Sequence, residues 1–337
     1  MFSLKNKTVL ITGGTGSFGR AAARKLLLDH LCAKVIIFSR DEWKQWEMRN
    51  SDPIFDHPNI RYFLGDVRDS QRLARAFRGV QVVIHAAALK QVPAAEYNPS
   101  EFIKTNIIGA MNIIENAIER EVERVIALST DKSVNPINLY GATKLCSDKL
   151  FIAGDSYVGA KGKPLLSVVR YGNVLGSRGS LLPHWKKMIQ EGASSLPVTD
   201  ERMTRFWITL DQAVDFVLLK LHEMEGREIF VPKIPSVKVI DIAKAMAPKI
   251  PIEITGIREG EKLHELLVSS DESRYALENP DGFTLLPRYS DQEISKHLQN
   301  TKKLAKRVVD GFSYDSDTNP EWLEGSSLKK LLRELGY

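Results

Sequence analysis

The hydrophobic positions in the first half of the chain form short, nearly continuous apolar runs, separated by longer amphipathic stretches. The runs are rich in Val and Ile, as in strands that helices cover on both faces, and the stretches between them have helical periodicity. The predicted strands span residues 8–12, 34–39, 60–64, 81–85, 124–128 and 165–170. The predicted helices between them span residues 18–30, 42–50, 70–78, 100–120 and 140–154. This alternation predicts an α/β fold with a Rossmann-like, doubly wound parallel sheet.

The pattern changes after Tyr171, where Gly and Pro become frequent and the predicted strands become short. We predict a helix at 212–222 and a strand at 228–231 that rejoins the sheet, then a helix at 239–246 and a strand at 252–255. The last 50 or so residues, beyond about residue 285, carry no motif. The domains that we predict are a cofactor-binding domain of residues 1–172, which residues 206–231 rejoin, and a smaller mixed substrate domain of residues 173–205 and 232–337.

Composition narrows the function classes. The 337 residues are 43% hydrophobic and 26% charged, which excludes a mostly disordered chain. The net charge of +5 is small for this length and is equally compatible with an anionic small ligand. The densest basic cluster consists of Lys302, Lys303, Lys306 and Arg307, whose spacing predicts one solvated side of a helix. We therefore expect no nucleic-acid partner.

The cysteines and the apolar segments indicate the compartment. Cys32 and Cys146 are the only cysteines, too few for a metal cluster or a disulfide framework. No apolar stretch approaches the roughly 20 residues that span a bilayer, and residues 1–7 lack the apolar core of a signal peptide. We expect a cytoplasmic protein with no bound metal and no membrane contact.

A glycine-rich loop follows the first predicted strand and opens a helix. Residues 12–19 read TGGTGSFG, with glycines in the pattern G-x-x-G-x-x-G. In this context glycines allow a tight turn, close approach to a pyrophosphate and close helix packing, and the helix N-terminus favours negative charge. The loop residues that we expect to bind a dinucleotide are Gly13, Thr15, Gly16, Ser17, Phe18 and Gly19.

The end of the second strand bears on the choice of cofactor. A carboxylate that holds the ribose 2′-hydroxyl of NAD is usually found about 20 residues past the loop, where this chain has Ser39 and Arg40. A hydroxyl and a guanidinium favour the 2′-phosphate of NADP, although Asp41 keeps NAD open. After the third strand, Asp66 either lies near the adenine or caps the next helix.

Tyr140 and Lys144 are four residues apart on a predicted helix and therefore share one face. A lysine ammonium beside a phenol lowers the pKa of the tyrosine, which makes it a general base for a sugar hydroxyl. The Y-x-x-x-K pattern alone is common by chance, and the glycine loop upstream gives it meaning.

These motifs resemble the extended short-chain dehydrogenase/reductase family. Residues 85–88 (HAAA), after the fourth strand, resemble the segment of that family that packs on the cofactor. The runs 128–132 (LSTDK) and 135–140 (NPINLY) closely resemble the inverting UDP-N-acetylglucosamine (UDP-GlcNAc) 4,6-dehydratases, which make the first intermediate of pseudaminic acid. Retaining relatives carry Thr-Asp-Glu where this chain has Thr130-Asp131-Lys132, and place it much further before the tyrosine. Without this resemblance, an Asp-Lys pair is more typical of a surface turn.

The resemblance implies a mechanism. Tyr140, aided by Lys144, takes the C4 hydroxyl proton as hydride passes to NADP⁺. Lys132, its pKa depressed by burial or by Lys144, removes the C5 proton, while protonated Asp131 protonates the leaving C6 hydroxyl. Hydride returns to C6, and C5 is reprotonated from the opposite face and inverted. Thr130 hydrogen-bonds the C4 oxygen.

The resemblance also implies binding residues. Beyond the loop and Ser39, Arg40 and Asp41, the implied cofactor site contains Asp66, Val67, Ala86, Ala87, Lys90, Leu128, Ser129, Tyr140, Lys144 and Val174. The implied UDP-GlcNAc site contains Lys90, Asn173, Thr199, Arg205, Arg258 and Glu261.

Relatives form homo-oligomers, often hexamers, and their product feeds flagellin glycosylation or a surface polysaccharide. Two alternatives remain open: a UDP-sugar C4-epimerase or retaining dehydratase, and a non-catalytic NADP-sensing regulator.

Overall fold

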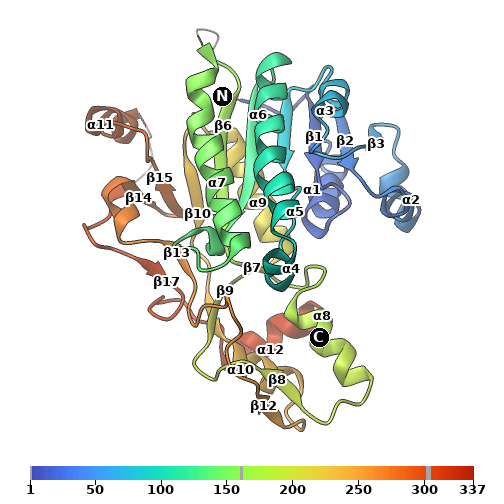
Figure 1. Ribbon diagram of the computed structural model, residues 1–337, viewed down its shortest axis with the longest axis vertical. Coiled ribbons are helices and arrows are strands. Elements are labelled where there is room, and N and C mark those ends of the chain that lie inside the picture. The colour runs from blue at the N-terminus through green and yellow to red at the C-terminus, as the bar shows by residue number, and fades with distance from the viewer. Residues whose placement is uncertain (1, 160–161, 301–304) are drawn as a thin grey trace.

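The structure, a computed structural model, describes residues 2–159, 162–300 and 305–337. A ten-stranded sheet forms its centre (Figure 1). Its strands, from one edge to the other, are β3 (Ile60–Leu64), β2 (Lys34–Ser39), β1 (Thr8–Thr12), β4 (Val82–His85), β5 (Arg124–Thr130), β6 (Leu165–Tyr171), β10 (Ile229–Pro232), β15 (Gly282–Leu285), β14 (Ala276–Asn279) and β16 (Lys306–Arg307). The pairs from β3 to β10 are parallel, and the order 3-2-1-4-5-6 is that of a doubly wound dinucleotide-binding sheet. The predicted fold class is confirmed.

The apolar runs form these strands because helices cover both faces of the sheet. On one face α1 (Ser17–Leu28) packs against α9 (Leu210–Glu223). On the other face α3 (Ser70–Ala76), α6 (Gly109–Glu119) and α7 (Leu139–Ala153) lie in a row. Between them, residues such as Val9, Val83 and Val125 are fully buried. All six strands predicted in the first half are present, with ends within two residues of those expected.

Several helices begin where a side chain caps their first turn. Asp41 accepts a hydrogen bond from Lys44 N at the start of α2 (Glu42–Ser51), and Asp69 does the same for α3. Asn138 accepts from Gly141 N at 2.7 Å and starts α7, the helix that carries Tyr140 and Lys144. Each cap satisfies a backbone donor that the helix leaves unpaired.

The long helix predicted at 100–120 is interrupted. It consists of α5 (Pro99–Phe102), a π-helical segment η2 (Ile103–Ile108) and α6, and it is preceded by α4 (Val92–Tyr97). Asn106 in the π-helical segment pairs with both backbone groups of Leu89 at 2.9 Å and donates to Thr143 Oγ1 at 3.0 Å. The segment therefore ties the loop after β4 to α7.

The C-terminal half adds a second hydrophobic core. Trp185, Leu196, Ile242 and Leu328 are at its centre. The elements around it are β7 (Asn173–Val174), α8 (Leu181–Gln190), β8 (Leu196–Val198), β9 (Thr204–Ile208), β11 (Ser236–Lys238), α10 (Val239–Met246), β12 (Ile252–Ile254) and α12 (Gly325–Glu334). Figure 1 shows α8, α10 and α12 together below the main sheet.

The remaining elements are β13 (Leu266–Val268), β17 (Tyr314–Asp315), α11 (Asp291–Asn300) and the 3₁₀ turns η1 (Pro53–Asp56), η3 (Asp131–Ser133), η4 (Gly154–Tyr157) and η6 (Asp271–Tyr275).

Two features differ from the sequence-based expectations. The hairpin β14–β15 extends the main sheet, although we assigned these residues to the smaller domain; the domain boundaries themselves stay a prediction. Lys306 and Arg307 lie in the edge strand β16 and not on a helix, because they pair with Leu277 and Glu278 of β14, whereas Lys302 and Lys303 lie outside the described residues. Across the part of the chain that is described, no helix combines the length and apolarity needed to cross a membrane.

Candidate active site

The glycine loop is shaped by close backbone contacts. Gly13 has φ +64°, and a Cβ there would lie 2.9 Å from the backbone of Ala86 and Ala87. A Cβ on Gly19 would lie 2.5 Å from Gly14 Cα, so only glycine at this position lets helix α1 lie so close to the backbone of the loop. Gly16 caps α1 without a side-chain hydrogen bond, which leaves the first-turn N–H groups of the helix to a ligand. The loop therefore fits a dinucleotide diphosphate.

The other predicted loop residues differ in their surroundings. Thr15 is buried, and Phe18 packs against the main core. Ser17 Oγ accepts a hydrogen bond from Arg178 N at 3.0 Å, which connects the loop to the segment that follows β7. The glycine loop is therefore in contact with a residue from the second half of the chain, Arg178.

At the end of β2, two of the three candidate cofactor residues are engaged within the protein. Ser39 is buried and its Oγ accepts from Gln45 Nε2 at 3.0 Å. Asp41 caps α2 and pairs with Lys44 Nζ at 2.8 Å, and the hydrogen bonds from Lys44 lower its pKa. Arg40 has an exposed side chain that lines a surface hollow together with Trp43.

Asp66 does not cap the next helix, because Asp69 does so. Its carboxylate instead accepts hydrogen bonds from Arg68 N, Nε and Nη2 at 2.7–3.0 Å, and Arg40 Nη1 lies 3.9 Å from it. Burial alone would raise the pKa of Asp66, but Arg68 lowers it. Val67 is buried behind it.

The proposed catalytic residues meet where β5 ends and α7 begins. A Cβ on Gly141 would lie 2.1 Å from the Lys132 carbonyl oxygen, so glycine allows α7 to approach the turn η3. Tyr140 and Lys144 are both buried on α7. Thr130 Oγ1 donates to Asp131 Oδ1 at 2.9 Å.

The pKa of Tyr140 differs from our expectation. Burial raises it to about 12, and the charge of Lys132 is the largest influence that opposes the rise, followed by the Thr130 hydroxyl. The expected lowering by neighbouring Lys144 is therefore wrong for the protein without its ligands. Burial lowers the pKa of Lys144 itself, while Asp148 raises it.

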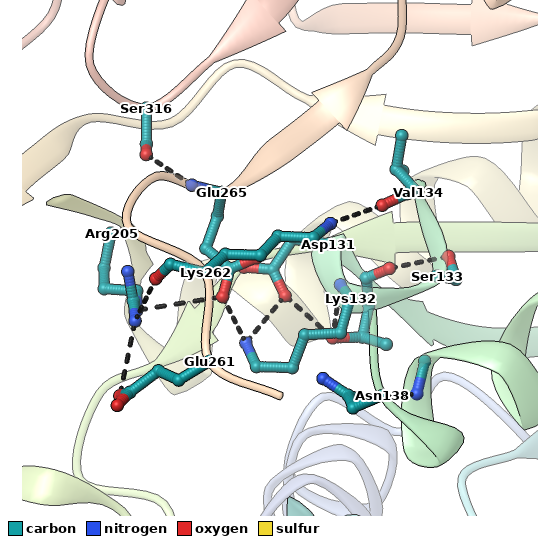
Figure 2. A network of polar contacts seen from close by, with 12 residues as sticks. Asp131, Lys132, Ser133, Val134, Asn138, Arg205, Glu261, Lys262, Glu265 and Ser316 are labelled. Carbon is teal, nitrogen blue, oxygen red and sulfur yellow. Dashed lines mark hydrogen bonds and ion pairs between the residues drawn. The ribbon is translucent and has the colours of Figure 1, made fainter. Parts of the chain in front are cut away.

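Lys132 lies between two carboxylates (Figure 2). Its Nζ is 3.1 Å from Asp131 Oδ1 and 3.1 Å from Glu265 Oε1. Both carboxylate side chains are almost completely buried, with 1% and 2% exposed. Burial by itself lowers the pKa of Lys132, but the charges of Asp131 and Glu265 outweigh it and raise the pKa. The expected depression of this pKa is wrong in direction.

Asp148 and Glu265 were not among the predicted site residues. Asp148 follows Lys144 by one helical turn and accepts from Ser129 Oγ at 2.7 Å and Ser133 Oγ at 3.1 Å. The i, i+4 spacing from Lys144 could have indicated it. Glu265 precedes β13, far from Lys132 in the sequence, and no local pattern of residues indicated it.

Two of the residues that we predicted to bind substrate, Arg205 and Glu261, contact other groups of the protein. Arg205 is buried and donates to the carbonyl oxygens of Thr204, Leu263 and Lys262 at 2.7–3.1 Å, so it organises the loop before β13. Glu261 Oε1 lies 3.5 Å from Arg205 Nη2.

The other three residues that we predicted to bind substrate differ in their surroundings. The side chain of Arg258 is exposed, whereas Thr199 Oγ1 contacts Met203 Sδ. Asn173 has a buried Oδ1 without a hydrogen-bond partner among the described residues, which fits a polar ligand.

The last group of candidates lines the strand ends. Ala87 N donates to Thr12 Oγ1 at 3.2 Å beside the glycine loop, and Leu128 and Val174 are partly buried near the ends of β5 and β7. Desolvation of part of the side chain and the charge of Lys132 lower the pKa of Lys90. The side chains of Lys90 and Arg258 are both exposed.

A family profile described as "Polysaccharide biosynthesis protein" matches residues 9–287. The chain belongs to this family. A UDP-N-acetylglucosamine 4,6-dehydratase (inverting) of Campylobacter jejuni is 52% identical over 98% of this chain and 98% of its own length. The resemblance stated from the sequence motifs is thereby confirmed. Another member of comparable length, a UDP-glucose 4-epimerase of Rickettsia akari, is 39% identical over 98% of this chain and 97% of its own.

Solved structures agree with the family fold. The Pen protein of Bacillus thuringiensis, 35% identical, superposes with a TM-score of 0.87 over 100% of this chain and 99% of its own. A dTDP-glucose 4,6-dehydratase of Streptomyces venezuelae, 24% identical, superposes with a TM-score of 0.68 over 76% of this chain and 86% of its own, and this likeness concerns the fold alone.

Proposed function

We propose that the protein is a UDP-GlcNAc 4,6-dehydratase that inverts C5 and yields UDP-2-acetamido-2,6-dideoxy-β-L-arabino-hexos-4-ulose. The observation that carries this proposal is the contact of Asp131 with Lys132 beside Tyr140, where an acid and an amine lie together. It is supported by the dehydratase of Campylobacter jejuni, whose similarity extends over nearly the whole chain.

The residues divide the work as follows. Tyr140, in its phenolate form, accepts the proton of the C4 hydroxyl, while Thr130 hydrogen-bonds the C4 oxygen. Once C4 is a ketone, C5 is acidified, and Lys132 takes its proton. Asp131, in its protonated form, gives a proton to the C6 hydroxyl, which leaves as water. A solvent-derived proton added to C5 from the opposite face gives the L-arabino product, and Tyr140 returns to solvent the proton that it took from the C4 hydroxyl.

The nicotinamide cofactor of this proposal is NADP, which when bound accepts a hydride from C4 and returns it to C6. Gly13, Gly16 and the first turn of α1 would hold its diphosphate, because a Cβ on Gly13 would fill the space that the loop leaves. Arg40 would hold the 2′-phosphate. Its side chain is exposed on the hollow, which Asp41 also lines, but the carboxylate of Asp41 is already engaged as the cap of α2 and in the ion pair with Lys44.

A C4-epimerase is the second candidate, since relatives named UDP-glucose 4-epimerase are 39% identical. An epimerase needs only the oxidation and reduction at C4 and gives no role to Asp131 or Lys132. The pair of these residues therefore favours the dehydratase.

Proton NMR of the purified protein with UDP-GlcNAc in D₂O, without added cofactor, tests the proposal. We expect a new C6 methyl signal, deuterium at C5 and L-arabino couplings. D-xylo couplings would retain the dehydratase and contradict inversion, and UDP-GalNAc without a methyl signal would indicate the epimerase. No conversion, even with added NADP⁺, would contradict both.

The family resemblance also supports a homo-oligomer, a hexamer in our proposal, that works on sugar nucleotides in the cytoplasm. The product would feed pseudaminic acid synthesis and flagellin glycosylation. Size-exclusion chromatography with light scattering tests the assembly, and a monomer would contradict it.

A further inference from the structure

The second carboxylate beside Lys132 has no role in the mechanism above. Glu265 is 1% exposed, and its Oε2 has no hydrogen-bond partner among the described residues. Its backbone is fixed, because Glu265 N donates to Ser316 Oγ at 2.8 Å and its carbonyl accepts from Ser316 N at 2.9 Å (Figure 2). A buried carboxylate with only one oxygen in an ion pair contributes little to the stability of a fold, because its desolvation costs free energy that one ion pair offsets only in part. A role in catalysis explains its presence better.

The charged groups around Lys132 have opposing effects on its proton affinity. Asp131 and Glu265 hold it as an ammonium, and cations from other elements press it toward the neutral amine. The titratable and charged groups that interact with it are Asp131, Glu265, Arg205, Lys262, Lys90 and Tyr140. Arg205 Nε also lies 3.8 Å from Glu265 Oε1, so one carboxylate faces both cations. Without Glu265, only Asp131 would remain to hold the proton on Lys132.

We propose that Glu265 is a positioning residue that holds Lys132 as an ammonium in contact with Asp131, and so sets how readily one proton passes between them. This inference rests on the proposed function. Elimination needs a neutral amine on Lys132 and a protonated Asp131, which arise from the resting pair when one proton moves from Nζ to Oδ1 across 3.1 Å.

The proton balance closes on the resting state. The Lys132 amine takes the C5 proton and becomes an ammonium, while Asp131 gives its proton to the departing C6 oxygen and becomes a carboxylate. The two residues are then again the ammonium and carboxylate of the structure. Glu265 thus opposes the first proton shift and stabilises the ammonium that elimination forms, as a buried carboxylate stabilises a charged base elsewhere.

Competitive labelling of the full-length protein with acetic anhydride, read by peptide mass spectrometry at pH 8, tests this inference. Only the neutral amine reacts, so the rate at Lys132 reports its protonation. Glu265→Gln removes a charge 3.1 Å away and should lower the Lys132 pKa by about one to three units, which raises the labelling rate at least tenfold. A change below twofold would overturn the inference.

Matched variants separate charge from access. Glu265→Asp keeps the charge and should stay within about threefold of the wild type, whereas a loosened loop would raise labelling in both variants. Glu278→Gln removes a carboxylate that pairs with Lys233 and Lys306, away from the site, and should leave the labelling rate at Lys132 unchanged. Should Glu265→Gln fail to fold, Glu265→Met removes the charge at similar volume and is judged by the same tenfold criterion.

Turnover gives a second readout. In Glu265→Gln the alkaline limb of the pH profile of kcat should move to lower pH by about one to three units, since Lys132 then loses to solvent, at a lower pH, the proton that the pair needs for elimination. A uniform loss of kcat without this shift would indicate a structural role and overturn the inference. If the wild type forms no methyl product, the proposed function fails, and labelling still decides whether Glu265 sets the charge of Lys132.

Discussion

The glycine loop and the centre around Lys132 lie at the carboxyl ends of strands β1 and β5 in the same sheet, but they are built in opposite ways. The loop is a continuous segment shaped by the absence of side chains, because a Cβ added at Gly13 or Gly19 would lie only 2.5–2.9 Å from backbone atoms of the protein. The centre combines charged side chains from η3 and from the loop before β13.

This difference determines what a substitution does to each region. In the loop, the groups proposed to bind the diphosphate are backbone N–H groups. A substitution that changes the shape of the loop should therefore weaken binding whether or not the new side chain is charged. In the centre the shape is set by buried side chains, and a change of charge alters proton affinity with little change of shape. The predictions below test this contrast from the largest expected effect to the smallest.

Tyr140→Phe should have the largest effect, a loss of about 10³-fold in formation of the methyl product, because the proton acceptor of the first step is removed. Cofactor binding should remain within about twofold, since the substitution leaves the backbone in place. The measurement is NMR of the product together with titration of NADP⁺. Tyr62→Phe, which removes a hydroxyl bonded to Phe55 O far from the site, is the control and should lose no activity. Equal losses in both variants would contradict the role of Tyr140.

Gly13→Ala should weaken NADP⁺ binding by about 100-fold, or about 2.7 kcal/mol. Its Cβ would collide with the backbone of Ala86 and Ala87, and the residue has a positive φ. Gly79→Ala is the matched control, because Gly79 has φ +71° and nothing within 4 Å of its Cβ. It should lose about 1 kcal/mol of stability through strain and keep its affinity for NADP⁺. Calorimetric titration checks both, and an unchanged affinity in Gly13→Ala would contradict the shape argument.

Arg40→Ala should weaken binding of NADP⁺ about tenfold and leave binding of NAD⁺ unchanged, because only the 2′-phosphate meets the guanidinium. Arg49→Ala, on the adjacent helix α2 and paired with Asp56, is the control and should alter neither affinity. Parallel titrations with both cofactors measure the ratio. A similar loss for NAD⁺ would mean that Arg40 supports the loop rather than the phosphate.

The same contrast explains which parts could be predicted from the sequence. The six strands and the loop depend on neighbouring residues, since hydrophobic periodicity and glycine spacing are local properties. The interruption at 103–108 was missed because the π-helical turn follows from Asn106 reaching Leu89 and Thr143 in other elements. Residues 276–285 joined the main sheet through pairing of β15 with β10, which no local pattern indicates.

The candidate site divides in the same way. The four residues Asp131, Lys132, Tyr140 and Lys144 lie close together in the sequence, and the family resemblance predicted them as a group. The protonation of Lys132 was predicted in the wrong direction because Glu265 comes from a distant segment, and two nearby charges outweigh burial. A sequence indicates which residue can be a base, and only the fold shows which charges surround it.

The last prediction concerns stability, and not binding or turnover, and it compares the response of the two regions to acid. His85, at the end of β4 beside the loop, is buried, and its Nδ1 lies 2.8 Å from Thr12 Oγ1. Burial lowers its pKa from 6.5 to about 3, with a smaller contribution from Lys144. Because the folded-state pKa lies below the unfolded value, the stability that neutral His85 contributes is complete above pH 6.5 and is lost as the pH falls toward 3.

The stability gap between the wild type and His85→Gln should therefore narrow by about 2 kcal/mol between pH 7 and pH 5, at about 1.4 kcal/mol per pH unit below 6.5. Urea unfolding at both pH values measures the gap. The exposed His184→Gln should show the same gap at both pH values. If the difference in unfolding free energy between the wild type and His85→Gln were the same at both pH values, the buried site of His85 would tolerate a charge. The contrast between an uncharged loop region and a charged centre would then fail at this position.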